Sequence, residues 1–221
     1  MNAIVINLAR RSQLLVEQQL RLLDDMEREE RDPDRLAALF RLDHLAARMR
    51  RNDENLLVLA GGQARRKPGV GMSLDALVLA ALSEIEQYQR IRVEVDSTVR
   101  VGGQATGDLV HLLAELFDNA AAFSPPDSPV RVLSTAHGGG VTIEISDEGI
   151  GLSPVALTEA NQLLGTPPDL NLDSSERMGL VVVSHLAARH RVRVQLRSGH
   201  AGTSAYVRVP DDLLIDEGAL A

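Results

Sequence analysis

The segment His111-Leu-Leu-Ala-Glu115-Leu-Phe-Asp-Asn119-Ala-Ala-Ala-Phe-Ser124 decides how the second part of this 221-residue chain is interpreted. His111, Glu115 and Asn119 are four residues apart, so in a helix they share one face, while apolar side chains cover the other. A carboxylate one turn before an amide offers oxygen ligands to a hard cation, and Mg²⁺ prefers such ligands together with phosphates. The alternatives are a solvated polar face, and a zinc site through His111 and Glu115 for which no further ligand is indicated.

A second motif is Ile145-Ser-Asp147-Glu148-Gly149-Ile150-Gly151-Leu152, in which Asp147 lies 28 residues after Asn119. It predicts a strand that ends in a carboxylate and then makes a Gly-x-Gly turn. The carboxylate of Asp147 can accept a hydrogen bond from an exocyclic amine. Gly149 and Gly151 let the backbone approach a flat ligand. An ordinary turn from strand to helix is the alternative.

Two further segments complete the set of candidate site residues. Ser174-Ser-Glu-Arg177-Met-Gly179-Leu180 opens a helix after a long polar loop. Free backbone N–H groups at a helix start bind phosphate, Gly179 allows close approach, and Arg177 adds positive charge. An ordinary capped helix is the alternative. Gly202-Thr203 precedes the last strand, and Thr203 is placed to bond the same group as Asp147.

Around these motifs the sequence alternates between helical and extended patterns. We predict helices over 73–87, 107–123, 153–164 and 178–189, and strands over 91–96, 130–136, 141–146, 192–197 and 204–209. The Gly-Gly-Gly run at 138–140 predicts a hairpin between two of the strands. Because hairpins interrupt the alternation, the fold class is α+β, with a two-layer α/β sandwich and a mixed sheet.

The first part of the chain predicts a helical hairpin. Residues 3–30 lack Gly and Pro, Asp32 before Pro33 is a good helix cap, and the second helix runs to about Ala60. One stripe repeats every seven residues in the first helix, and another is spaced 3-4-3-4-3 in the second: Leu8, Leu15, Leu22; Leu42, Leu45, Met49, Asn52, Leu56, Leu59. Two helices cannot bury stripes this long, so we expect a homodimeric four-helix bundle. Packing against the second domain is the alternative.

Charge and glycine content divide the chain into domains. Residues 1–67 carry 13 basic and 11 acidic residues, net +2, whereas 68–221 carry 10 basic and 20 acidic, net −10. We expect a helical hairpin over 1–62, a linker over 63–72, the α/β domain over 73–213 and a tail over 214–221.

Composition excludes several classes of protein. The chain has no cysteine, which removes disulfide scaffolds, thiol nucleophiles and cysteine-ligated metal sites. A net charge of −8 with five aromatic residues argues against nucleic-acid binding. No apolar run reaches membrane-spanning length and no signal peptide is recognised, so we expect a cytoplasmic location. The core must be aliphatic.

Taken together, the motifs from Ser73 to Pro210 resemble the ATP-binding domain shared by histidine kinases, gyrase, Hsp90 and MutL. The resemblance implies ATP and Mg²⁺ as ligands and a lid over 165–178. It also implies the following roles: Mg²⁺ binding by Asn119 with Glu115 possible as a second ligand, general base Glu115, adenine contact Asp147, pocket residues Gly149 and Gly151, phosphate neighbours Gly179 and Leu180.

The hairpin before this domain resembles the core of a sensor histidine kinase. The stretch 39–61 is similar to actinobacterial sensor kinase-like proteins, often membrane-anchored, which implies that this chain is the cytoplasmic portion. The implied partners are a response regulator or a roadblock-type or small GTPase-like protein. His44, preceded by Asp43, is the candidate phosphoacceptor, although ordinary kinases carry this histidine on the first helix. A helix-surface histidine is the alternative.

Some residues depart from the family pattern. The lid helix lacks a run of glycines, no Lys or Arg follows Asn119 in Ala-Ala-Ala-Phe123, and no obvious ring is available to stack on adenine. These departures leave a second hypothesis, a kinase-like scaffold with little or no ATP turnover. A gyrase-type or Hsp90-type ATPase without phosphohistidine is a third, which the N-terminal hairpin disfavours.

Overall fold

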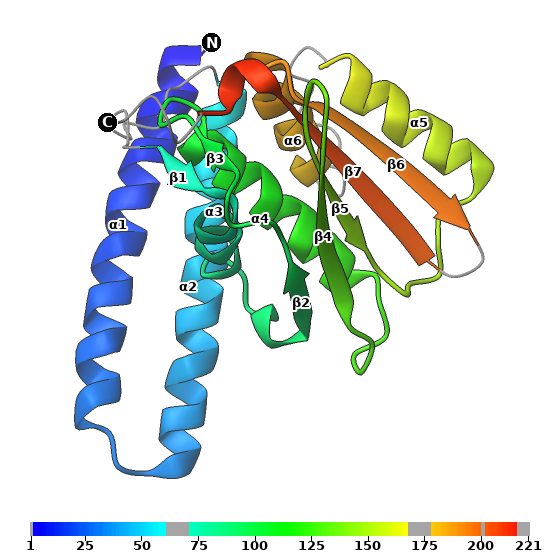
Figure 1. The fold of residues 1–221 in the computed structure, drawn as a ribbon. Helices are drawn as coiled ribbons and strands as arrows, with labels where there is room; N and C mark the ends of the chain where they lie inside the picture. Colours follow the sequence, from blue (N-terminus) through cyan, green and yellow to red (C-terminus); the bar gives the residue numbers. More distant parts are fainter. Residues whose placement is uncertain (1, 61–70, 168–177, 200–201, 216–221) are drawn as a thin grey trace. The chain divides into compact units, whose positions relative to one another are not determined.

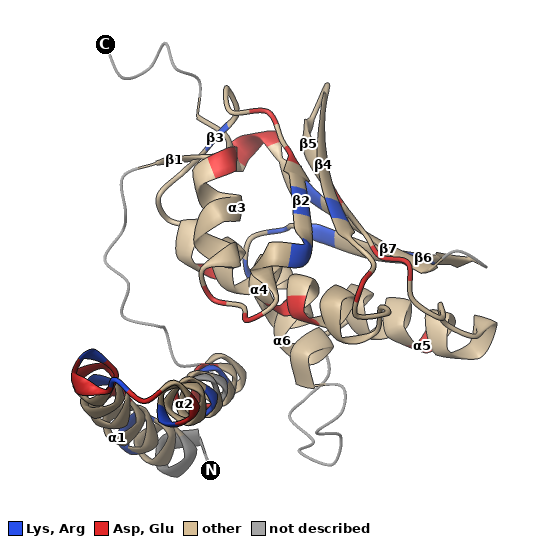
Figure 2. Ribbon diagram, turned by 90° about the horizontal axis from the view of Figure 1, so that it is seen from below, with Lys and Arg blue, Asp and Glu red and all other residues tan. Residues whose placement is uncertain are grey.

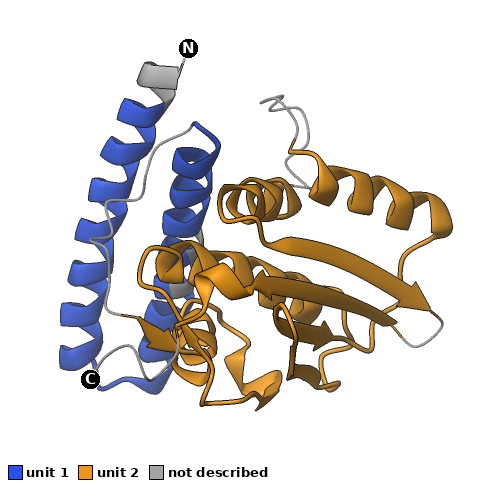
Figure 3. Ribbon diagram, turned by 45° about the horizontal axis from the view of Figure 1, so that its top comes forward, with its two compact units in different colours: residues 1–65 blue, residues 66–221 orange. Residues whose placement is uncertain are grey.

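A computed structural model describes residues 2–60, 71–167, 178–199 and 202–215. The chain divides into two compact units, residues 1–65 and 66–221. Figure 1 shows the helices and strands, and Figure 3 distinguishes the two units by colour. None of the described helices combines the length and the apolar character required to span a membrane.

The first unit is a hairpin of two long helices, α1 (Asn2–Glu29) and α2 (Pro33–Leu59). The Asp32 side chain caps α2 by accepting hydrogen bonds from the backbone N–H groups of Asp34, at 2.9 Å, and Arg35, at 3.2 Å. Pro33 occupies the first turn, where its missing N–H costs nothing. The predicted cap and helices are confirmed.

The contact between α1 and α2 uses a different stripe from the predicted ones. Val16 and Ala46 are buried and lie equally far from the turn, as expected for facing positions in an antiparallel hairpin. The predicted stripes are mostly exposed, by between 51% and 68% for Leu8, Leu15, Leu22, Leu42, Leu45 and Met49. Of the rest, Asn52 is exposed, Leu56 half-buried and Leu59 buried. Most of the stripe residues therefore remain available to a further partner.

The second unit contains a five-stranded mixed sheet in the order β2-β4-β5-β7-β6. Only β2 and β4 are parallel, and the other neighbours are antiparallel, which confirms the predicted mixed sheet. The strands are β2 (Ile91–Glu94), β4 (Val130–His137), β5 (Gly140–Ser146), β6 (Arg193–Gly199) and β7 (Gly202–Pro210). The helices are α3 (Leu74–Leu82), α4 (Thr106–Ala122), α5 (Pro154–Gly165) and α6 (Met178–Arg189), with short 3₁₀ turns at Tyr88–Arg90 and Asp211–Leu213.

Helices cover one face of this sheet (Figure 1). Alternate strand residues such as Ile143, Ile145 and Val207 are buried on that face, together with Phe117 of α4 and Leu186 of α6. The core is aliphatic apart from Phe117, as composition predicted. The opposite face is polar, and Figure 2 shows arginine segments on its strands.

The helix predicted over 73–87 is shorter in the structure and ends at Leu82. The Ser83 hydroxyl donates to the carbonyl of Ala80 at 2.7 Å, which competes with helix continuation. The tight turn that follows places Ile85 in the core. Ser73 occupies the cap position but makes no capping hydrogen bond. A small antiparallel pair, β1 (Met72–Ser73) with β3 (Arg100–Val101), was not predicted.

Candidate functional site

On the polar face of α4, His111 and Glu115 are buried and Asn119 is half-buried. His111 and Glu115 are each 7% exposed, and Nε2 of His111 lies 3.7 Å from Oε1 of Glu115. The interpretation as a solvated face is therefore wrong. Packing of α3 and α6 against α4 buries this helix within the unit.

The start of α6 lies directly against this face. A Cβ atom added to Gly179 would come 2.7 Å from Oε2 of Glu115 and 3.6 Å from Nδ2 of Asn119. Glycine is therefore the residue that lets the two helices approach. Nδ2 of Asn119 is buried and has no hydrogen-bond partner in the described part of the chain. An unpaired buried donor is costly, so this N–H group is available to an acceptor such as a phosphate oxygen.

The N-terminal end of α6 also favours an anion. Its first turn contains no acidic residue, and the helix dipole places partial positive charge at this end. Leu180 follows Gly179 and is half-buried. Arg177 and most of the predicted lid, residues 168–177, lie outside the described residues.

Asp147 lies directly after β5 and beside β7. Its Oδ1 accepts hydrogen bonds from the backbone N–H groups of Gly149 at 2.7 Å and Thr203 at 3.2 Å. Its Oδ2 has no hydrogen bond to any described residue, which leaves one carboxylate oxygen for an amine donor. The structure thus brings Asp147 and Thr203 together, because Ser146 and Ser204 are paired across the two strands.

The glycines after Asp147 are required by close approaches. A Cβ at Gly149 would collide with the carbonyl oxygen of Phe123, at the end of α4. Gly151 has a φ of +73°, in the left-handed region that favours glycine, and its Cβ position lies 2.7 Å from the Gly199 carbonyl oxygen. These contacts hold the Asp147 loop against α4 on one side and the β6–β7 end on the other.

Phe123 is a candidate site residue that the sequence analysis did not include. Its backbone lies against Gly149, and its side chain is 66% exposed. An aromatic residue four positions after Asn119 was the available signal, but only the structure shows that it meets the Asp147 loop.

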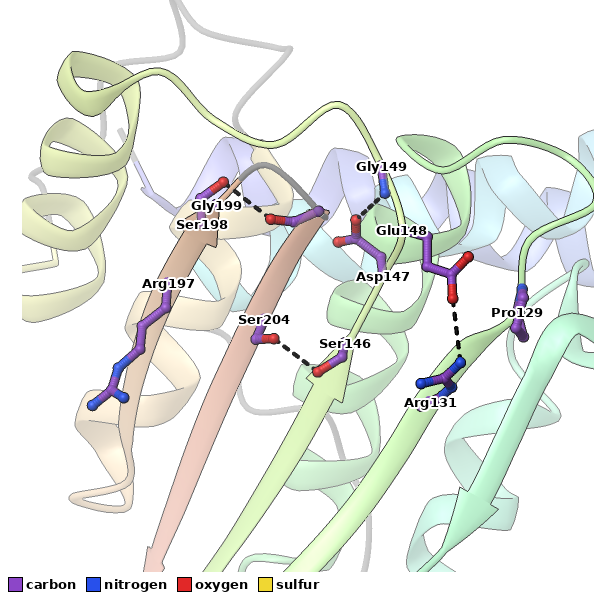
Figure 4. A pocket seen from close by; sticks show the side chains of 11 residues that line it. Pro129, Arg131, Ser146, Asp147, Glu148, Gly149, Arg197, Ser198, Gly199 and Ser204 are labelled. Carbon is purple, nitrogen blue, oxygen red and sulfur yellow. Dashed lines mark hydrogen bonds and ion pairs between the residues drawn. The ribbon is translucent and has the colours of Figure 1, made fainter.

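A cavity of about 710 Å³ opens beside Asp147 (Figure 4). Of the predicted residues only Asp147 and Gly149 line it, and the remaining lining residues include Arg131, Ser146, Ser204 and Arg197 on the strands. Glu115, Asn119 and Gly179 do not line this cavity. It therefore belongs to the polar face of the sheet rather than to the α4–α6 junction.

The donor set at the α4–α6 junction fits magnesium. Mg²⁺ takes one or two protein oxygens and completes its shell with water and phosphate, which Asn119 and Glu115 can accommodate. Within the described residues no group of three His, Cys, Asp or Glu is placed to hold a metal ion, so the zinc alternative gains no support.

His44 lies in α2, and its side chain is outside the described residues. Its assignment as phosphoacceptor therefore stays a prediction.

Residues 104–213 match the family described as histidine kinase-, DNA gyrase B-, and HSP90-like ATPase. They form a domain of this ATPase family. The chain that carries the ATPase domain is 27% identical over 191 residues to the phosphate regulon sensor protein PhoR of Pseudomonas aeruginosa, covering 80% of this chain and 41% of the relative. It is 29% identical over 150 residues to the sensor-like histidine kinase SenX3 of Mycobacterium tuberculosis, covering 63% and 36%. The chain thus spans about two fifths of the length of these homologous sensor kinases.

Solved structures share the fold. Full-length ShkA in complex with AMPPNP has a TM-score of 0.61 at 16% identity, covering 94% of this chain and 45% of that one. The Acinetobacter baumannii histidine kinase AdeS has a TM-score of 0.52 at 15% identity, covering 90% and 95%. At these identities the likeness extends to the fold alone, and it includes the α+β architecture predicted from the sequence.

Proposed function

We propose that this chain is the core of a sensor histidine kinase that binds Mg²⁺-ATP and transfers its γ-phosphoryl group to His44. The observation that carries the proposal is the junction of α4 and α6. There a helix start with Gly179 meets Glu115 and the unpaired amide of Asn119. A helix start beside oxygen ligands suits a magnesium-bound polyphosphate.

The Asp147 loop supplies the base pocket in this proposal. Oδ2 of Asp147 accepts a hydrogen bond from the adenine amine, while Oδ1 stays bonded to Gly149 and Thr203. Gly149 and Gly151 let the backbone approach the flat base. Phe123, whose backbone carbonyl lies against Gly149 and whose side chain is exposed, supplies the candidate ring to stack on the base, since offset aromatic pairs are favourable.

The phosphates lie at the start of α6, near the backbone of Gly179 and Leu180, with Arg177 adding positive charge. Asn119 holds the metal ion, with Glu115 as a possible second ligand. Magnesium, when bound, neutralises negative charge on the phosphates. Because the unit carries net charge −10 over residues 68–221, these positive contributions are needed for an anionic substrate to bind.

In the transfer step a ring nitrogen of His44 forms a bond to the γ-phosphorus. The bond from that phosphorus to the bridging oxygen breaks, and ADP leaves with the electron pair. Glu115, directly or through a bound water, accepts the proton of the ring. Asp43 orients the imidazole in its nucleophilic form.

The same proposal covers assembly, partner and location. The exposed stripes of α1 and α2 pair with a second copy to form a four-helix bundle. A response regulator receives the phosphoryl group, and the chain is the cytoplasmic portion of a sensor. The proposed domains are the hairpin over 1–62, the linker over 63–72, the ATPase domain over 73–213 and the tail over 214–221. None of the comparisons supports a roadblock-type or small GTPase-like partner.

Incubation with γ-³²P-ATP and magnesium tests the proposal. We expect acid-labile label on the protein, lost in His44→Gln and Asn119→Ala and lost when EDTA removes magnesium. His137→Gln is the matched control, because His137 is an exposed residue at the end of β4.

Label that survives in His44→Gln overturns this histidine as the acceptor. A protein that takes up no label and shows no calorimetric binding of Mg²⁺-ATP overturns the kinase proposal as a whole. Binding without label indicates a nucleotide-binding scaffold instead.

A further inference from the structure

The polar face of the sheet carries a row of arginine and serine side chains across all five strands. Register pairs Arg92 with Arg131, Arg131 with Ser146, Ser146 with Ser204, and Ser204 with Arg197. Arg193 of β6 pairs with Arg208 of β7 on the same face. This pair lies two residues beyond the Gln195–Tyr206 pair. We call Arg92, Arg131, Arg193, Arg197 and Arg208 the arginine face.

The charge of this face is opposite to that of the unit. Five of the ten basic residues in 68–221 lie on it, against two carboxylates of the strands, Glu94 and Glu144. Counted over the strand residues alone, the face is net +3 within a segment of net −10, and three further carboxylates, Asp147, Glu148 and Asp212, lie at its ends. Figure 2 shows the arginine segments on the strands. All five arginines are exposed.

Most of these arginines have no internal partner. Within the described part of the chain, Arg92, Arg193 and Arg208 make no hydrogen bond or ion pair, and Arg197 lies over the Tyr206 ring at 4.9 Å. Arg131 makes one exposed ion pair, at 3.3 Å, with Glu148. The central carboxylate, Glu144, instead accepts from Tyr206 at 2.9 Å and from Ser146 at 3.1 Å. The hydrogen bond that Tyr206 donates to Glu144 raises the pKa of Tyr206.

Like charges placed opposite each other destabilise a sheet. Arg193 and Arg208 are directly paired on neighbouring strands, and Arg92 and Arg131 are neighbours in the parallel pair. A sheet face with two such pairs is less stable than one without them, so stability alone does not account for their presence.

Both ends of the arginine face are hollowed. The cavity of about 710 Å³ at one end is lined by Arg131, Arg197, Ser146 and Ser204, and also by the carboxylates of Asp147 and Glu148 (Figure 4). A second cavity of about 430 Å³ at the other end is lined by Arg191, Arg193, Arg208 and Asp212, with Gly139 and Pro210. Each hollow brings two arginines of the face together beside carboxylates of the chain itself, Asp147 and Glu148 in the first and Asp212 in the second.

The extent of the face points to a macromolecule. Arg92 and Arg197 are separated by four strand spacings, about 19 Å at the usual spacing, which no single small anion bridges. Guanidinium groups match carboxylates with two parallel hydrogen bonds. Glu94, Glu144 and the net charge of the unit repel a long polyanion such as nucleic acid or an anionic membrane.

We propose that the arginine face docks a carboxylate-rich surface of a partner protein. The arginine face is separate from the α4–α6 junction, and it meets the Asp147 loop at only one of its two cavities. It adds a recognition surface on the ATPase domain to whatever contacts the helical hairpin makes.

A fluorescent ten-residue peptide with glutamate at alternate positions is the probe, because its carboxylates repeat at about 7 Å when extended, like residues two apart on a strand. Anisotropy with the full chain at about 50 mM salt gives its affinity. We expect at least a tenfold loss of affinity in Arg193→Gln/Arg208→Gln. We expect less than a twofold change in Arg21→Gln/Arg35→Gln, which alters net charge equally through exposed residues of the hairpin.

Two further measurements make the outcome decisive. Thermal unfolding checks that Arg193→Gln/Arg208→Gln is folded, and loss of the like-charge pair should leave its midpoint unchanged or raised. A single-stranded oligonucleotide and vesicles containing anionic lipid are offered as competing ligands. Equal losses in the two double variants, no peptide binding, or tighter binding of oligonucleotide or vesicle than of peptide overturns the proposal.

Discussion

Gly179 occupies a position where any side chain would displace the buried carboxylate of Glu115. The Cβ of Gly179→Ala would lie 2.7 Å from Oε2 of Glu115, and the carboxylate must move to relieve the clash. Alanine is the better helix former by about 1 kcal/mol, so the free energy of unfolding should change little. The crowding falls on Glu115 in the proposed phosphate and magnesium site, and crowding of a packed site of this kind costs about 1–3 kcal/mol. We therefore expect calorimetry to show about a tenfold weaker affinity for Mg²⁺-ATP.

Gly165→Ala is the matched control for this experiment. Gly165 ends α5, and a Cβ there meets no atom within 4 Å. Its affinity for Mg²⁺-ATP should equal that of the wild type. Unchanged affinity in Gly179→Ala as well would show that the phosphates do not lie at the start of α6.

Asp147 should set the preference for adenine. Asp147→Asn keeps an acceptor for Gly149 and Thr203, but it turns the second oxygen into an amide donor. Hydrogen bonds to charged groups are worth about 1.5–3 kcal/mol, so ATP should bind about 10- to 150-fold more weakly. GTP, which offers a carbonyl where ATP has its amine, should lose less, and competition between the two nucleotides measures the change.

Glu148→Gln provides the comparison, because Glu148 is the exposed neighbour of Asp147 and should leave nucleotide preference intact. If Asp147→Asn retains the full preference for ATP over GTP, another residue reads the base.

The candidate residues could be chosen from the sequence because their spacing shows which of them share a helix face or a turn. The residues that surround them in the fold could not be predicted. Periodicity places His111 and Glu115 on one helix face, yet it cannot show that α6 covers that face and buries them. Phe123 was missed for a similar reason. Its importance comes from its carbonyl lying against Gly149, a contact between residues 26 positions apart that no local pattern encodes.

At the scale of elements, Arg90 stabilises the end of α4 and the loop that follows it through side-chain hydrogen bonds. Its guanidinium donates to the carbonyls of Ala121 at 2.9 Å, Pro125 at 2.6 Å and Ser128 at 3.1 Å. Lysine cannot reach three diverging acceptors, so Arg90→Lys should lower the free energy of unfolding by about 1–3 kcal/mol. Chemical denaturation measures the loss.

Arg92→Lys, two residues away on the exposed side of β2, should change the free energy of unfolding by less than about 0.5 kcal/mol. Equal stability of the two variants would mean that the three carbonyls are satisfied by water once Arg90 is replaced.

The elements predicted best are those with a long hydrophobic periodicity or with glycine or proline residues at their ends. The bounds of α6 matched the prediction, and β4 and β5 follow from alternation around the glycine run. The end of α3 was mispredicted because residues 83–87 are good helix formers, and the turn depends on the Ser83 hydroxyl and on burial of Ile85. β1 and β3 are two residues each, too short to show any periodicity.

At the scale of the whole molecule, the sequence shows which segment is acidic, but it does not show how the charged side chains are distributed over the surface of that segment. The net charge of −8 argued against nucleic acid as a partner. The sheet register adds what composition could not show, because alternate residues of four strands direct half of the arginines of 68–221 to one face. A unit of net negative charge thereby presents a positive surface.

Assembly into a dimer should depend on the exposed leucines of α1 and α2. Leu15 of α1 and Leu45 of α2 are each 55% exposed and lie about equally far from the turn, so they fall in the same layer of a bundle. Burying a leucine is worth about 1.5–3 kcal/mol, and a symmetric dimer counts each substitution twice. Leu15→Glu or Leu45→Glu should therefore raise the dimer dissociation constant by at least about 100-fold.

Sedimentation equilibrium over a range of concentrations measures this dissociation constant. Leu79→Glu is the control, because Leu79 of α3 is 60% exposed but lies outside the hairpin, and it should leave the dimer intact. Monomerisation should also abolish the label on His44 if the phosphoryl group passes between subunits, whereas transfer within one subunit would leave it. A wild-type chain that sediments as a monomer at all concentrations, or a dimer that tolerates both glutamates, would show that the exposed leucines serve a different partner.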